Sequence, residues 1–252
     1  EGSAVYAHSN TIVNFTNCNF QHNYAGSKGA VLYIGEASSV IVNHCYFEHN
    51  RLMYDSSSKP AKGTAIYAEQ YTTIKIVQST FEKHERALSS YTYTTSSYHS
   101  GGILYTGPFC NVSVLNSLFK YNRANEGGVA YIGSQSNVSF TRCVFHANGA
   151  KNKAGVLYVK SHGIATIHYC NLSLNYVSDS TSYDDDNYTL KGYGGVLALE
   201  SLTTVVVEDS LFVNNTAGSG GCAYLPSGDV RFTFTRCMFR TNVAKDYSGV
   251  VY

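Results

Sequence analysis

The sequence lacks several features that would define whole classes of protein. No apolar stretch approaches the roughly 20 residues of a membrane-spanning helix, which argues against insertion into a membrane. The formal net charge is +1 with no basic stripe, which argues against nucleic acid and anionic membranes as partners. No initiating Met and no signal peptide stand at Glu1, which indicates a processed form or an excerpt of a longer protein.

Tryptophan is absent and proline occurs only 3 times, whereas Gly and Tyr occur 22 times each. With abundant Val, Thr and Phe, this composition is typical of strands and turns. No segment shows apolar residues at a spacing of three to four, which excludes helical repeats. The composition therefore favours an all-β fold.

A short motif recurs eight times along the 252 residues. A Cys or Ser is followed two residues later by Phe (once Leu) and three residues after that by Asn (once His). The copies begin at Cys18, Cys45, Ser79, Ser117, Cys143, Cys170, Ser210 and Cys237. A repeat of this kind running from end to end indicates one solenoid domain over residues 1–252, in which each unit folds only by stacking on its neighbours.

Each unit predicts three short strands joined by three corners. Apolar residues five and three positions before the Cys/Ser alternate with polar ones, as in a half-buried strand. The length varies only after the Asn, where Ser-, Thr-, Tyr- and Asp-rich insertions occupy about 51–62, 84–100 and 176–193. We therefore expect a right-handed parallel β-helix of about eight coils with three short strands each.

The Asn of the motif predicts a structural ladder, because an amide side chain at a corner can donate and accept between successive coils. One copy carries His84 at this position. The Asn members are Asn23, Asn50, Asn122, Asn148, Asn175, Asn215 and Asn242.

Two sequence elements resemble a known family. A Gly-Gly-apolar-apolar element recurs, and Phe-x-x-Asn stands at 20–23, 47–50, 119–122, 145–148, 212–215 and 239–242. These elements resemble the repeats of the chlamydial polymorphic outer-membrane proteins and other extracellular β-helices of the pectin-lyase-like class. The resemblance covers essentially the whole chain, and it implies surface display and adhesion.

A row of aromatic residues recurs about twelve positions before the motif, in a strand that reads apolar on both faces. Such a strand is covered on both sides. We expect its Leu/Ile residues to face the core and its Val and Tyr residues to face outward, under the chain's own insertions such as 88–100 or under a lateral partner. The expected interface residues are Tyr6, Tyr33, Tyr67, Tyr105, Tyr131, Tyr158, Tyr224 and Tyr252.

Seven cysteines leave at least one unpaired. Five of them share the repeat position that also accepts Ser, which favours buried free thiols. Disulfides between adjacent coils, Cys18 with Cys45 and Cys143 with Cys170, are the alternative, because stacked strands lie about 4.8 Å apart. Cys110 and Cys222 lie outside this row.

Six Asn-x-Ser/Thr sequons fall at predicted outward or loop positions, as N-linked glycans require. They therefore predict secretion and N-linked glycans, and we expect no other cofactor. Asn111 and Asn137 share one row in consecutive coils, so two glycans there would crowd each other. The sequons are Asn14, Asn111, Asn137, Asn171, Asn187 and Asn214.

Metal and catalytic sites receive little support from the sequence. Asp184, Asp185 and Asp186 are weak candidates for Ca²⁺, and a solvated loop is the favoured interpretation because no ligand-spaced motif surrounds them. His22 and His49 stack beside Glu48 but lack further ligands, which favours surface histidines. The acidic residues occupy different rows, so no pair of carboxylates converges and we expect no enzyme. Those acids are Glu36, Glu69, Glu126, Glu200, Glu208 and Asp209.

The chain starts and ends at the same phase of the repeat, without a capping helix or charged segment. This indicates a segment of a longer solenoid, or a subunit that stacks on itself end to end or laterally. The leading hypothesis is an extracellular glycosylated β-solenoid that builds a filament or a cell-surface layer. The alternative is an adhesin that binds cell-surface or glycan ligands through its insertions, and the third hypothesis is a polysaccharide-active enzyme.

Overall fold

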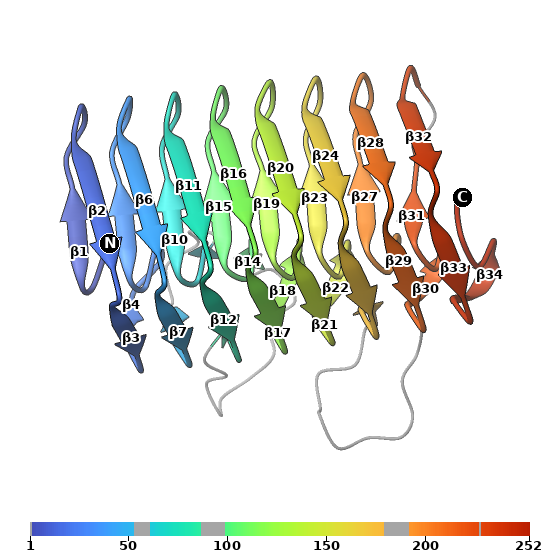
Figure 1. Ribbon diagram of the computed structural model, residues 1–252, viewed down its shortest axis with the longest axis horizontal. Coiled ribbons are helices and arrows are strands. Elements are labelled where there is room, and N and C mark those ends of the chain that lie inside the picture. Colours follow the sequence, from blue (N-terminus) through green and yellow to red (C-terminus); the bar gives the residue numbers. More distant parts are fainter. Residues whose placement is uncertain (1, 53–60, 87–98, 179–191, 227) are drawn as a thin grey trace.

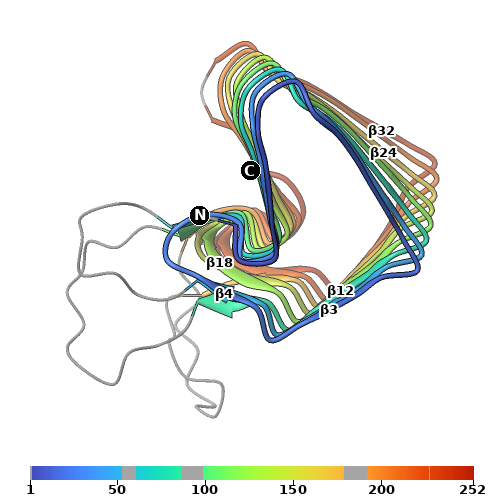
Figure 2. The ribbon, with the colours of Figure 1, turned by 90° about the vertical axis from the view of Figure 1, so that its left-hand side faces the viewer.

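The computed structural model describes residues 2–52, 61–86, 99–178, 192–226 and 228–252. Within these residues the chain forms short β-strands and no helix. The described part of the chain accordingly contains no helix that could cross a membrane. The strands wind into a column of stacked coils, seen from the side in Figure 1 and along its axis in Figure 2.

Three parallel sheets of eight strands each run the length of the column. Sheet A contains β1 (Val5–Ala7), β5 (Leu32–Ile34), β10 (Ile66–Ala68), β15 (Leu104–Thr106), β19 (Ala130–Ile132), β23 (Leu157–Val159), β27 (Leu197–Leu199) and β31 (Ala223–Tyr224). Sheet B contains β2 (Ile12–Thr16), β6 (Ser39–Asn43), β11 (Thr73–Val77), β16 (Asn111–Leu115), β20 (Asn137–Thr141), β24 (Ile164–His168), β28 (Thr204–Glu208) and β32 (Arg231–Thr235). Sheet C contains β3 (Asn19–Gln21), β7 (Tyr46–Glu48), β12 (Thr80–Glu82), β17 (Leu118–Lys120), β21 (Val144–His146), β25 (Asn171–Ser173), β29 (Leu211–Val213) and β33 (Met238–Arg240). The predicted right-handed parallel β-helix with three-strand coils is confirmed.

A fourth, narrower ladder follows the Asn corner and was not predicted. It is split into a three-stranded sheet D and a seven-stranded sheet E. Several of its strands are only two residues long, which is too short to show an alternating pattern. Sheet D contains β4 (Tyr24–Ala25), β8 (Arg51–Leu52) and β13 (Glu85–Arg86). Sheet E contains β9 (Ala61–Lys62), β14 (His99–Ser100), β18 (Arg123–Glu126), β22 (Gly149–Lys153), β26 (Tyr176–Val177), β30 (Thr216–Ser219) and β34 (Val243–Tyr247).

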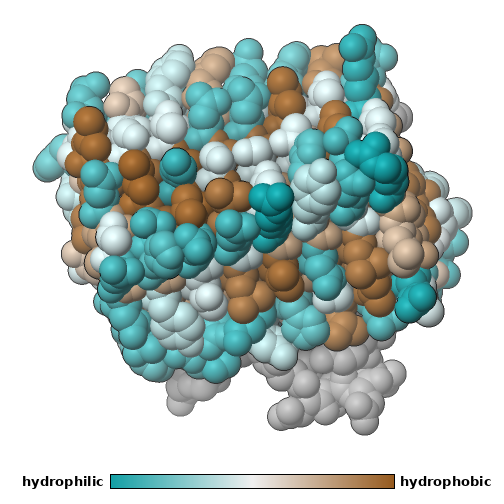
Figure 3. All heavy atoms as spheres, in the orientation of Figure 1, coloured by the Kyte–Doolittle hydropathy of each residue, from teal (hydrophilic) through white to brown (hydrophobic). Residues whose placement is uncertain are grey.

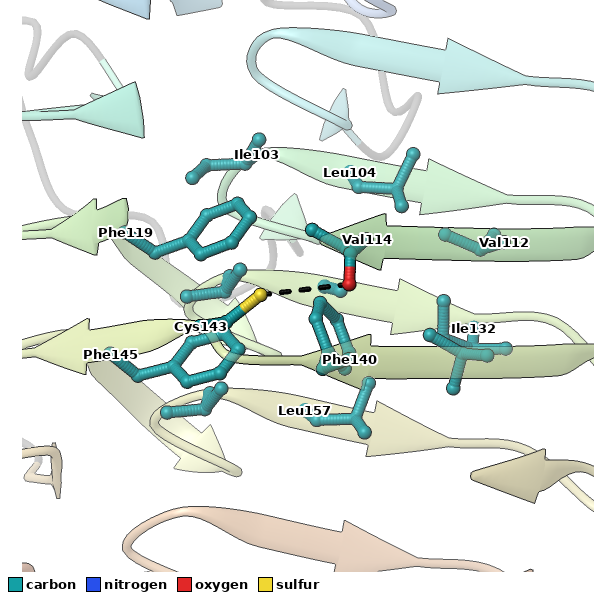
Figure 4. Packing of buried hydrophobic residues seen from close by; sticks show 14 of the residues in the cluster. Ile103, Leu104, Val112, Val114, Phe119, Ile132, Phe140, Cys143, Phe145 and Leu157 are labelled. Atoms are coloured by element: carbon teal, nitrogen blue, oxygen red, sulfur yellow. Dashed lines mark hydrogen bonds between the residues drawn. The ribbon is translucent and has the colours of Figure 1, made fainter. Parts of the chain in front are cut away.

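The core is a set of columns in which like residues lie over one another. Phe47, Phe81 and Phe119 are paired in register through β7, β12 and β17. Their ring centroids are 4.4 and 5.3 Å apart, and the rings are fully or almost fully buried. Figure 4 shows Phe119 and Phe145 continuing this stack, with Phe140 of sheet B packed edge-on against Phe145. In-register parallel pairing explains the repeat, because each inward position meets its own copy one coil away.

The corners are held by residues in the left-handed region of φ. The corner between sheets B and C has such a residue in every coil, for example His44 at φ 52°. The His44 N–H donates to the carbonyl of Val77 one coil away at 3.0 Å. The backbone thus turns a corner while its hydrogen bonds still join neighbouring coils. The eight residues of this row are Asn17, His44, Gln78, Asn116, Arg142, Tyr169, Asp209 and Arg236.

The Gly-Gly element marks the entry into sheet A. Gly127 has φ 64°, and a Cβ there would lie 2.2 Å from the carbonyl oxygen of Ala130. A Cβ on Gly128 would lie 2.2 Å from the carbonyl oxygen of Gly155 in the next coil. The first Gly is therefore required by its own turn, and the second by the close approach of two coils.

Sheet A has its Leu/Ile residues inward and its Tyr residues outward, as expected. Leu32 and Ile34 belong to the main core, whereas Tyr33 does not. The expectation that Val31 shares the Tyr face is wrong, because Val31 also belongs to the core. The N–H groups of Val31 and Leu32 both donate to the carbonyl of Ala65, so the chain bends there and the alternation starts only at Leu32.

The described ends of all three long insertions lie on one side of the column. Residues 52 and 61, 86 and 99, and 178 and 192 flank the insertions, and they adjoin the short strands of sheets D and E.

Candidate functional site

The outer face of sheet A carries a ladder of tyrosine rings. Tyr6, Tyr33, Tyr67, Tyr105 and Tyr131 stack nearly parallel, with centroids 4.6 to 5.3 Å apart. The ring of Tyr158 is turned by 72° relative to Tyr131, and Ala198 then interrupts the row. Beyond the interruption, Tyr193 packs against Tyr224, and Tyr224 against Tyr252. The structure thus brings all the predicted interface tyrosines onto one face.

Residues of the same chain cover most of this ladder. Only 4% of Tyr67 and 3% of Tyr158 is exposed. The Lys28 ammonium lies 4.4 Å from the centre of the Tyr67 ring, and Lys153 lies 5.2 Å from that of Tyr158. The expected cover by 88–100 falls largely outside the described residues. A lateral partner could reach rings such as Tyr6, which is 46% exposed, but not the buried centre.

Glu69 gathers donors from its own coil and the preceding coil on this face. Its carboxylate accepts hydrogen bonds from the Tyr33 hydroxyl at 2.8 Å and the Tyr67 hydroxyl at 3.0 Å, and it pairs with Lys28 at 3.3 Å. Partial burial alone would raise the pKa of Glu69, but these donors and the lysine charge lower it, so the net pKa lies below its usual range. Burial and the neighbouring carboxylate raise the pKa of Tyr67. The cluster therefore holds an ionised Glu against neutral tyrosines.

Glu200 forms a second cluster near the interruption of the ladder. It accepts hydrogen bonds from the Tyr158 hydroxyl at 2.8 Å and the Ser161 hydroxyl at 2.8 Å, and it also pairs with Lys160. Although burial opposes it, this set of donors lowers the pKa of Glu200 to about 2. Burial raises the pKa of Glu126. The charges of Lys160 and Glu200 also act on this carboxyl group, Lys160 lowering its pKa and Glu200 raising it. The expectation that these acids lie apart is thus only partly met.

The sequence carries a signal for the charged groups on this face. A charged or polar residue stands five positions before most of the tyrosines, as Lys28, Lys62, Glu126 and Lys153 do before Tyr33, Tyr67, Tyr131 and Tyr158. These residues form one row of sheet E or adjoin it. Because they reach across to rings of the same or the next coil, their role becomes clear only once the coils are stacked.

The Asn ladder is an unbroken chain of amides over the second half of the column. The Asn148 side-chain N–H₂ donates to Asn175 Oδ1 at 3.0 Å and to the carbonyl of Phe119 at 3.0 Å. The same pattern joins Asn122, Asn148, Asn175, Asn215 and Asn242, and separately Asn23 with Asn50. In every member after Asn23, both the side-chain oxygen and the side-chain nitrogen have partners, which explains why Asn is fixed at this corner.

His84 interrupts the Asn ladder. It is fully buried, its Nδ1 lies 3.2 Å from the carbonyl oxygen of Asn50, and its backbone N–H donates to Asn122 Oδ1. Its Nε2 has no hydrogen-bond partner in the described structure. Burial lowers the pKa of His84 to about 4, so the side chain is neutral at physiological pH.

The Cys/Ser row is also a hydrogen-bond ladder. The Ser79 hydroxyl accepts from the Cys45 N–H at 3.0 Å, and the Cys170 thiol accepts from the Cys143 N–H at 3.4 Å. The position therefore needs a small side chain that accepts along the axis, which either Ser or Cys supplies. All seven cysteines are free thiols, including both pairs proposed as disulfides. Burial raises the pKa of Cys222 to about 12, which makes this thiol unreactive.

The sequons within the described residues all have an exposed Asn. These are Asn14, Asn111, Asn137, Asn171 and Asn214, whereas Asn187 lies outside the described residues. The Asn137 side-chain N–H₂ donates to Asn111 Oδ1 at 3.1 Å, so these two side chains are in contact. Two glycans attached to side chains in contact would crowd each other.

The candidate metal ligands are not brought together. Asp184, Asp185 and Asp186 lie outside the described residues. The rings of His22 and His49 stack at 5.2 Å, and His49 lies 3.4 Å from the Glu48 carboxylate. Within the described ranges, no three His, Cys, Asp or Glu side chains are placed to hold a metal ion.

Comparisons with known proteins agree with the fold. The family described as the right-handed β-helix region matches residues 1–175. A curated relative, the metabotropic glutamate receptor-like protein R of Dictyostelium discoideum, is 26% identical over 246 residues. The match covers 87% of this chain and 14% of the relative, so the chain spans only a small part of that protein's length. No solved structure matches significantly.

Proposed function

The chain belongs to the right-handed β-helix family, and from this premise we propose that it is a structural element of an extracellular glycoprotein. Its role is to form a stiff column of about 38 Å, from eight coils at about 4.8 Å each, within a filament or a cell-surface layer. The exposed Asn of all five sequons within the described residues supports a secreted glycoprotein. Similarity to a protein named receptor-like supports display at a cell surface.

The observation that carries the proposal is that a coil fully buries its inward apolar residues only where it has a neighbouring coil on both sides. Phe20 and Val13 face inward in the first coil, as Phe239 and Phe232 do in the last, yet all four are only partly buried. Their counterparts one coil further in, such as Phe47 and Phe212, are fully buried. The burial of each coil thus depends on coils on both sides of it, as in a column that is built by stacking.

We propose that the chain acts as a scaffold and not as a catalyst. Glu126 and Glu200 come nearest to an acid–base pair, because their pKa values are shifted in opposite directions. However, Glu200 is saturated by donors from Tyr158, Lys160 and Ser161, and the Tyr158 ring is sealed. A turnover assay on acidic polysaccharides tests this point, and product formation by the intact protein would contradict it.

A second candidate function is ligand binding through the insertions. The observation that favours it is their common origin on the side of sheets D and E, which would gather three segments over one wall. Cell-surface or glycan ligands are the expected class. Deleting residues 180–190 should then abolish adhesion to cells while the thermal unfolding temperature stays unchanged.

End-to-end association of purified protein tests the scaffold proposal. Sedimentation velocity and electron microscopy should show rods that lengthen with concentration in steps of one column. Phe239→Lys places a charge on the end face and should shorten the rods, whereas Thr233→Lys on the outer wall of the same coil serves as the matched control. Rods of a single column length at every concentration would count against the proposal.

A further inference from the structure

The outer face of sheet C carries an apolar row with one polar member. Leu118, Val144, Asn171, Leu211 and Met238 are Cα partners in five consecutive coils. Val144 is 38% exposed and Met238 is 57% exposed, and the other two apolar members are partly exposed. Adjacent partners in a parallel sheet lie about 4.8 Å apart, so the row is continuous along the column.

Further apolar side chains extend this row into a patch. Leu174, at the corner next to Asn171, is 45% exposed, and Val213 lies beside Leu211 on the same face. We call Leu118, Val144, Leu174, Leu211, Val213 and Met238 the sheet C patch. Figure 3 shows hydrophobic side chains gathered over the lower front of the molecule, where sheet C lies in Figure 1. A contiguous exposed apolar patch calls for a covering group.

Asn171 is placed to carry that group. It lies between Val144 and Leu211 in the register of sheet C, and Asn171-Leu172-Ser173 is a sequon. Its side chain is exposed, and its amide makes no hydrogen bond to the described residues. By contrast, the Asn137 amide is engaged with Asn111. Asn171 therefore presents a free Nδ2 in the middle of the patch.

We propose that an N-linked glycan on Asn171 covers the sheet C patch. The inner N-acetylhexosamine has an apolar ring face and an acetamide methyl group, which pack on the aliphatic side chains of Val144 and Leu211. The inference rests on the proposed secretion, because it needs a lipid-diphosphate-linked oligosaccharide as donor. Asn171 Nδ2 forms a bond to the anomeric carbon, the bond from that carbon to the diphosphate oxygen breaks, the nitrogen loses one proton, and the lipid diphosphate leaves.

The alternative occupant of the patch is a second copy of the chain, and the test separates the two. In the experiment, the 252-residue chain is expressed in eukaryotic cells so that it passes through their secretory pathway. Glycopeptide mass spectrometry then reports which sequons carry a glycan. Asn171→Gln removes the acceptor, and Ser173→Ala removes only the sequon and leaves Asn171 in place. Asn111→Gln is the matched control, because its partners on sheet B are the polar residues Thr73 and Asn137.

We expect Asn171 to be occupied, and both sheet C variants to lose one glycan. Both should then bind more of a fluorescent dye for apolar surfaces and should self-associate, whereas the Asn111→Gln control should do neither. Glycans at other sequons but not at Asn171 would overturn this inference and would leave the proposed glycoprotein intact. Equal dye binding in all variants would overturn it as well, and a secreted protein with every sequon bare would overturn the proposed glycoprotein with it.

Discussion

At the scale of the residue, the stack depends on side chains that both donate and accept along one axis. The Asn ladder does this with the two ends of one amide, and Ser or Cys does it with a single atom. A side chain that can perform only half of the exchange leaves a buried polar atom without a partner, which is costly. His84 is such a side chain, because its Nε2 is buried and unpaired.

Replacement of His84 by Asn should remove an acid-sensitive step from unfolding. The pKa of His84 is about 4 in the folded chain and 6.5 for the free side chain. Between pH 4 and 6.5, His84 therefore binds a proton in the unfolded chain but not in the folded chain. The free energy of unfolding therefore falls as the pH decreases from 6.5 towards 4, by up to about 3 kcal/mol. Above pH 6.5 both states are neutral and this contribution is constant.

Urea unfolding between pH 4 and 8 measures the effect of His84→Asn. The variant should lose this part of the pH dependence, and at pH 7 it should be about 1 kcal/mol more stable, because the amide reconnects Asn50 with Asn122. His162→Asn, a change at an exposed corner, is the control and should keep the original slope. An unchanged slope in His84→Asn would contradict the account.

Cys170 provides a second test at the same scale. Cys170→Ser should keep the stability within about 1 kcal/mol, because a hydroxyl accepts from the Cys143 N–H as Ser79 does from Cys45. Cys170→Ala leaves that buried N–H unpaired and should cost about 1–3 kcal/mol. Thermal unfolding of the two variants decides, and equal stability would show that the thiol only fills space.

At the scale of the element, the strands were predictable from the sequence and their surroundings were not. Alternation and fixed spacing placed Phe47 over Phe81 and Asn148 over Asn175, because each inward residue meets its own copy. The spacing could not place Lys28 over Tyr67, since the two meet only across the turn and one coil apart. Several strands of sheets D and E are only two residues long and leave no pattern, and the bend at Val31 delays the alternation until Leu32.

The corners predict where the elements can be stabilised. Leu202 is 45% exposed and has φ 60°, a conformation that costs an ordinary L-residue about 1–2 kcal/mol. Leu202→Asn should raise the stability by about 0.5–1 kcal/mol, because Asn tolerates this conformation. Asn116→Leu, at a corner with φ 49°, should lower the stability by a similar amount. Chemical denaturation measures the free energy of unfolding of both variants. Changes of the same sign in the two variants would contradict the argument.

At the scale of the whole molecule, the column follows from the absence of any unit that can fold alone. Each coil buries its apolar residues only against the coils above and below, so stability is shared between neighbours. The sugar proposed on sheet C and the insertion flanks that adjoin sheets D and E give the walls of the column separate proposed roles. All of these roles require the coils to lie in strict register.

The separation between spin labels along sheet B tests that register most directly. Ile41 is connected to Thr166, Val206 and Thr233 through four, five and six successive Cα pairings. Labels introduced as unnatural amino acids at Ile41 and at each of the other three positions should give narrow distances of about 19, 24 and 29 Å. Equal steps are expected although residues 176–193 are inserted between Thr166 and Val206. Distances that grow with the number of intervening residues, or that spread broadly, would contradict the stacked column.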